Sequence, residues 1–72
     1  MQEARGVGRF ARYLIEPQPE GAYLFVWETG ESEAPEQDHL LDSVQDAKEV
    51  AFEDFGVPLA SWCTWEGKGF FG

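Results

Sequence analysis

The first apolar segment of the chain, residues 9–16, has the alternating pattern of a β-strand. Arg12 and Leu14 fall on one alternating set, and Tyr13 and Ile15 fall on the other. Successive side chains of a strand point to opposite faces of a sheet. The pattern therefore predicts a strand with two different faces.

A second strand is expected after a turn. The turn reads Pro17-Gln18-Pro19-Glu20-Gly21, in which the prolines fix φ and the glycine allows positive φ. Residues 22–28 follow and are apolar on both alternating sets. A strand with two apolar faces belongs at the centre of a sheet or against a partner. Residues 9–16 and 22–28 are therefore predicted to form a hairpin.

The most clearly marked element is a helix over residues 44–55. Ser43 is a favourable N-cap, and Asp46 occupies the capping-box position. Gly56 can adopt the left-handed conformation that ends a helix, and the proline at position 58 prevents its continuation. Apolar residues at helical spacing predict a face that packs on the sheet. They are Val44, Ala47, Ala51 and Phe55, flanked by Val50 and Phe52.

Two further segments complete the predicted fold. Residues 59–66 have an alternating pattern that predicts a last strand. Residues 38–41 are long enough for a short strand, but their apolar and polar positions do not alternate regularly. The order strand, strand, optional strand, helix, strand predicts an α+β domain of two layers, with one helix on a mainly antiparallel sheet of three or four strands. We place this domain at residues 9–66, after a basic N-terminal arm (1–8) and before a flexible tail (67–72).

The net charge of the chain limits the classes of partner that we expect. The 72 residues carry 14 acidic and five basic side chains, a net charge of −9, and three of the cations are Arg5, Arg9 and Arg12. Such a balance repels phosphate backbones and favours basic proteins, so nucleic acid is not expected as a ligand. No apolar run approaches the ~20 residues of a membrane span. With no export signal and one cysteine, we expect a cytoplasmic protein that does not bind membranes.

Two groups of carboxylates are candidate protein-binding residues. Asp46, Glu49 and Glu53 lie opposite the apolar stripe of the predicted helix, with no basic residue at the spacing that would pair with them. The second group lies in the polar segment before the helix and consists of Glu31, Glu33 and Glu36. Either group could bind a basic protein or remain a solvated acidic surface.

Residues suited to catalysis or metal binding are few. Asp38, His39 and Asp42 lie close together in sequence, but their spacing matches no recognised metal-binding loop. Cys63 lies in the apolar 59–66 segment, where a buried small side chain is expected rather than a nucleophile. We predict no enzymatic activity, cofactor or metal. An enzyme or metal site at Asp38, His39 and Asp42 is the alternative.

Aromatic residues make up 15% of the chain. We expect them to form the core rather than a surface that stacks on bases, because the chain has few cations to surround such a surface. They are Tyr23, Phe25, Trp27, Trp62 and Trp65, among others. A homodimer formed through residues 23–27 or through Phe70-Phe71 is the alternative to a heterologous partner.

Two segments carry a resemblance to a known family. Pro19-Glu20-Gly21-Ala22-Tyr23 leads into a strand, and Asp42-Ser43-Val44-Gln45-Asp46-Ala47 opens a helix. With the order of elements over residues 10–65, these segments resemble the HicB-like antitoxin domain. The resemblance implies a partial ribonuclease-H-like sheet covered by a helix. It also implies a protein that masks a small basic ribonuclease toxin and has no catalytic residues of its own.

Overall fold

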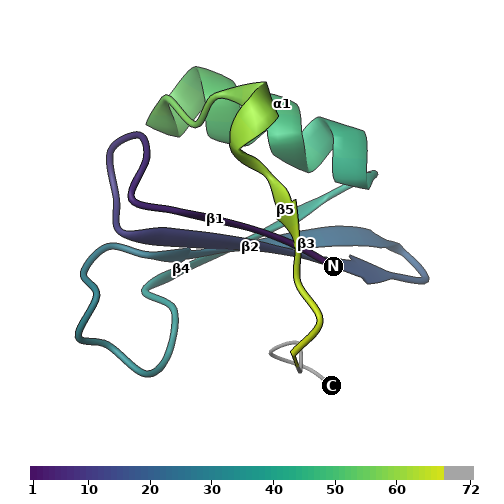
Figure 1. The fold of residues 1–72 in the computed structure, drawn as a ribbon. Coiled ribbons are helices and arrows are strands. Elements are labelled where there is room, and N and C mark those ends of the chain that lie inside the picture. The colour runs from purple at the N-terminus through teal and green to yellow at the C-terminus, as the bar shows by residue number, and fades with distance from the viewer. Residues whose placement is uncertain (68–72) are drawn as a thin grey trace.

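One helix covers one face of a five-stranded antiparallel sheet in the computed structural model, which describes residues 1–67 (Figure 1). The strand order is β4-β3-β2-β1-β5. The elements are β1 (Gln2–Arg5), β2 (Arg12–Gln18), β3 (Gly21–Trp27), β4 (Gln37–Leu41), α1 (Val44–Phe55), the short 3₁₀ helix η1 (Leu59–Ser61) and β5 (Cys63–Thr64). The predicted α+β class with two layers is confirmed.

The predicted hairpin is present as β2 and β3, joined by a turn that ends at Gly21. This glycine has φ of 149°, and a Cβ atom there would lie 2.1 Å from the carbonyl oxygen of Leu41. Only glycine therefore allows β4 to approach the turn this closely. β3 lies between β2 and β4, which confirms the central position that its two apolar faces predicted.

The predicted helix is also confirmed, with both of its caps. The hydroxyl of Ser43 accepts a hydrogen bond from the backbone N–H of Asp46 at 3.1 Å. Gly56 is left-handed, with φ of 72°. Ala47 and Ala51 are fully buried against the sheet, whereas Phe52, at the border of the stripe, is 53% exposed.

The core lies between α1 and the sheet. Its buried residues are Ala4, Tyr13, Ile15, Ala22, Leu24, Val26, Ala47, Ala51 and Val57. Fully burying a side chain as large as those of Ile15, Leu24 and Val26 stabilises the fold by ~1.5–3 kcal/mol. The small residues Ala47 and Ala51 let α1 approach the sheet closely.

The N-terminal segment differs from the prediction. Residues 1–8 were expected to form an arm outside the domain, but β1 lies inside the sheet and pairs with both β2 and β5. Ala4 is buried, and the carboxylate of Glu3 accepts from Nε of Arg12 at 2.6 Å and from Nε of Arg5 at 2.9 Å. Arg5 and Arg12 therefore pair with a strand of the sheet. The sheet has five strands rather than three or four.

The C-terminal part of the prediction is also corrected. Within the predicted strand 59–66, the strand β5 covers only Cys63–Thr64. The backbone first turns at η1, where the N–H of Ser61 donates to the carbonyl of Pro58 at 3.0 Å. Likewise, β2 begins at Arg12 rather than at residue 9. Residues 38–41, expected as an optional strand, are part of β4. Apart from Gly67, the predicted flexible tail lies outside the described residues.

Candidate functional site

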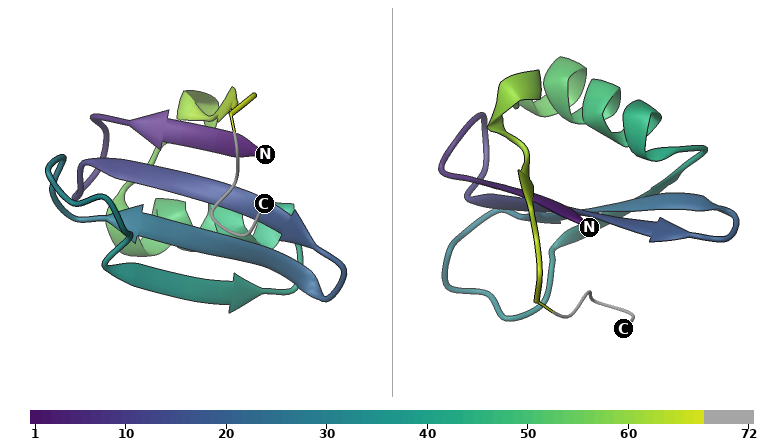
Figure 2. Two further views of the ribbon diagram at one scale, coloured as in Figure 1. Left: turned by 90° about the horizontal axis from the view of Figure 1, so that it is seen from below. Right: turned by 45° about the vertical axis from the view of Figure 1, so that its right-hand side comes forward.

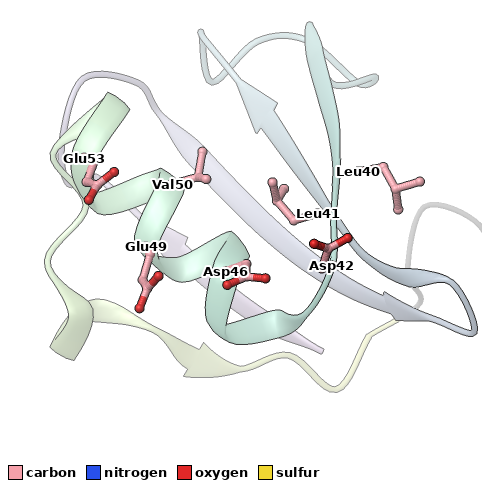
Figure 3. Close-up of a pocket in the computed structure, with 7 residues that line it drawn as sticks. All are labelled: Leu40, Leu41, Asp42, Asp46, Glu49, Val50 and Glu53. Atoms are coloured by element: carbon pink, nitrogen blue, oxygen red, sulfur yellow. The ribbon is translucent and has the colours of Figure 1, made fainter.

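A groove of about 330 Å³ lies between α1 and β4 (Figure 3). Its lining combines three aliphatic residues with four acidic ones, and the side chain of Leu40 points away from α1 (Figure 3). These residues are Leu40, Leu41, Val50, Asp42, Asp46, Glu49 and Glu53. The groove therefore brings together all three helical carboxylates that the sequence suggested as binding residues.

The positions of the carboxylates follow from local structure. Asp46, Glu49 and Glu53 are spaced by three and four residues, so they share one side of the helix. The Ser43 cap fixes where the helix begins and hence which side this is. Asp42 comes directly after β4 and lines the groove on the side of this strand (Figure 3).

The electrostatics of the groove are one-sided. No lysine or arginine lines it. Among residues 1–67, both side-chain ion pairs use Glu3, which lies on the sheet away from the groove. Like charges at helical spacings of three or four destabilise a helix by ~0.2–0.5 kcal/mol per pair. A cationic ligand would relieve this repulsion.

The groove runs beside an edge of the sheet. β4 pairs with β3 along its whole length and is the outermost strand on that side (Figure 2, left). Leu40 on this strand is 49% exposed. Backbone N–H and C=O groups on the outer side of an edge strand are available to pair with another chain.

The second group of predicted binding residues lies elsewhere. Glu31, Glu33 and Glu36 belong to the loop between β3 and β4, which lies on the side of the sheet opposite α1 (Figure 1). The carboxylate of Glu36 accepts a hydrogen bond from the backbone N–H of Glu28 at 3.1 Å. The structure therefore does not join the loop and the helix into one acidic surface.

The sheet face opposite α1 holds a second cluster of apolar side chains. Phe25 is 1% exposed and Trp27 is 5% exposed, so neither offers a ring face on which a base could stack. Trp62 instead packs on the helix side of the sheet. The guanidinium carbon of Arg12 lies 4.3 Å from the ring centroid of Trp27 and 5.1 Å from that of Trp65. Here the aromatic residues hold an arginine of the same chain.

The alternation of β4 separates two of the candidate metal residues, and the third, Asp42, lies after this strand. Asp38 and His39 are neighbours in β4 and point to opposite faces of the sheet. Nε2 of His39 lies 3.0 Å from Oε1 of Gln37. Within residues 1–67, no three His, Cys, Asp or Glu side chains gather in a way that could hold a metal ion.

The exposure of Cys63 differs from the expectation. The sequence predicted a buried side chain, but the thiol is exposed because β5 is a two-residue strand at the edge of the sheet. The alternation of residues 59–66 gave no sign that the strand would be this short.

Sequence reasoning missed the apolar part of the groove and Asp42 as one of its residues. Their common position depends on β4 packing beside α1, which is a tertiary arrangement.

Comparison with protein-family models, with curated proteins and with solved structures finds no significant match for this chain. No helix within residues 1–67 is both long enough and apolar enough to cross a bilayer.

Proposed function

We propose that this protein is a non-catalytic binding module that holds a cationic segment of another protein in the groove between α1 and β4. One observation carries the proposal: four acidic residues and the aliphatic side chains of Leu41 and Val50 line one groove, and no lysine or arginine lines it. Lysine and arginine side chains suit such a surface, since their charged ends pair with carboxylates while their methylene stems cover apolar groups.

The HicB-like resemblance gives this proposal its most specific form. A module of that kind would bind a small basic ribonuclease and mask it. The acidic groove supports this role through charge complementarity alone. A neutralising protein of this type works in the cytoplasm, and we place the chain there.

The test compares two variants that remove the same number of charges. The groove variant carries Asp46→Asn, Glu49→Gln and Glu53→Gln. The loop variant carries the corresponding changes to glutamine, at Glu31, Glu33 and Glu36. Binding of a synthetic lysine-rich peptide is measured by titration calorimetry at low and at physiological salt. Because exposed ion pairs contribute ~0.2–1 kcal/mol each, we expect the groove variant to bind about tenfold more weakly and the loop variant to bind almost normally.

Equal weakening in both variants would contradict the proposal, since it would mean that the peptide senses only the net charge. Loss of the salt dependence in the groove variant alone would support it. Circular dichroism of each variant checks that the fold is retained.

A homodimer is the second candidate. Its supporting observation is the exposure of three large apolar side chains, Leu40, Phe52 and Leu59, which are 49%, 53% and 51% exposed. Residues 23–27 do not favour it, because β3 is flanked by two strands and most of its side chains are buried. The second predicted interface, Phe70-Phe71, lies outside the described residues. A monomeric mass by light scattering at high concentration would eliminate the dimer.

A further inference from the structure

We infer that the partner segment binds as an added β-strand, paired along the outer edge of β4 and alternating cationic with apolar residues. This inference rests on the proposed function, because it specifies the form of the ligand that the groove accepts. It adds a requirement that an acidic groove alone does not impose. The ligand must be extended and must offer one backbone edge.

The first support is the backbone of β4. All five of its residues are paired with β3, so the strand is held in register along its whole length. Among the described residues, no strand or helix pairs with its other edge. In an antiparallel pair, every second residue directs both its N–H and its C=O to the same neighbour, so the alternate residues direct theirs outward. Peptides add to sheets through such groups.

The second support is how this edge is protected. Exposed edge strands are commonly blocked by proline, lysine, bulges or short length. β4 contains neither proline nor lysine, and its pairing with β3 has no interruption. The charges beside it are acidic, at Asp38 within the strand and at Asp42 just after it. Such protection repels another acidic strand but attracts a basic one.

The same charges select against self-association through β4. A second copy of the chain would bring its own Asp38, Asp42 and helical carboxylates to the shared edge. Like charges placed opposite one another in a sheet are destabilising. The occupant that fits this edge is therefore a different, cationic chain.

The third support is the alternation of faces along β4. Gln37, His39 and Leu41 face α1, while Asp38 and Leu40 face the opposite side, as their partners in β3 show. An added strand follows the same pleat. One alternating set of its side chains would extend over the groove, where the carboxylates of α1 stand, and the other set would lie beside Leu40. This geometry predicts lysine or arginine at every second position, with apolar residues between them.

The experiment uses the whole protein and a synthetic peptide of alternating lysine and valine, about as long as β4. Two further peptides have the same sequence but carry N-methyl groups on alternate residues, one along each backbone edge. A fourth peptide has the same composition in a scrambled order. Fluorescence anisotropy gives the affinities, and hydrogen exchange reports on the amides of β4.

We expect the unmodified peptide to bind and to slow exchange at alternate amides of β4. Methylation of one edge should weaken binding by at least about tenfold, and methylation of the other edge should have little effect, because only one edge pairs with the sheet. The scrambled peptide should bind more weakly than the alternating one.

Two results would overturn the inference in different ways. If all four peptides bind equally in a salt-sensitive manner and the β4 amides stay unprotected, the groove attracts cations without strand addition, and the proposed function survives. If none of the peptides binds, and the groove variant gives the same result as the unmodified protein, the proposed function fails together with this inference.

Discussion

The backbone N–H of Arg9 donates a hydrogen bond to the carbonyl oxygen of Phe55 at 2.7 Å. This contact joins the loop between β1 and β2 to the last residue of α1, so the end of the helix is satisfied by a segment far away in sequence. The last carbonyl groups of a helix have no partner within the helix. The loop therefore fixes the end of α1 nearer to Glu53, and with it one end of the groove.

Gly8 makes that contact possible, and we expect Gly8→Ala to destabilise the protein by more than ~1 kcal/mol. Gly8 has φ of 65°, and a Cβ atom there would lie 2.4 Å from the carbonyl oxygen of Phe55. A left-handed non-glycine residue and a backbone clash both raise the free energy of the folded state. Urea unfolding measures the change. Gly30→Ala is the matched control, because nothing lies within 4 Å of a Cβ atom at that position. Equal stability of the two variants would mean that the loop does not pack as described.

Ser43→Ala should lower the free energy of unfolding by ~0.5–2 kcal/mol, because it removes the hydroxyl that caps α1. The same loss should appear as a lower midpoint in thermal denaturation. Ser32→Ala removes a hydroxyl from the exposed loop between β3 and β4 and should leave the midpoint unchanged. Equal thermal midpoints for the two variants would disprove a capping role for Ser43.

Glu53→Gln should stabilise the isolated protein by ~0.3–1 kcal/mol while it weakens binding of a cationic peptide. Glu53 stands in the last turn of α1, where the helix dipole disfavours an anion, and four residues after Glu49, which repels it. Glu20→Gln, in the exposed β2–β3 turn, changes the net charge equally and serves as the control for unfolding and for binding. A loss of stability at position 53 would show that this carboxylate is needed for the fold itself.

The thiol of Cys63 should react with a maleimide or a disulfide reagent at nearly the same rate in the native and in the urea-unfolded protein, because it is exposed. Cys63→Ser should accordingly change the free energy of unfolding by less than ~0.5 kcal/mol, as is usual for surface substitutions. Strong protection of the native thiol would contradict the short β5 described above.

The elements with local signals were predicted well from sequence. Ser43 and Gly56 marked both ends of α1, and the apolar character of both faces of residues 22–28 identified the central strand. These signals depend on a residue and its near neighbours, so no knowledge of the fold is needed to interpret them.

The elements that depend on distant partners were not predicted. β1 contains only one buried apolar residue, Ala4, and its glutamate and arginine resemble those of a solvated arm. Its place in the sheet becomes apparent only when Glu3 is seen beside Arg12 of the next strand. The groove likewise depends on residues that are distant in sequence. Its helical carboxylates could be grouped from their spacing, whereas Leu40, Leu41 and Asp42 join them only through packing of β4 beside α1.

The position of β1 has a consequence for synthesis of the chain. β1 lies between β2 and β5, with Gln2 opposite Thr64 and Glu3 opposite Cys63. A ribosome makes β5 after the other elements of residues 1–67, so β1 has one uncovered edge until then, while β4 has one throughout. Domains generally fold as their chains emerge, and exposed edges invite pairing between chains. Premature termination or slow translation after α1 would therefore leave the four-residue β1 as an edge strand in place of the two-residue β5. Because short edge strands protect against pairing between chains, such products should aggregate more readily than the finished protein.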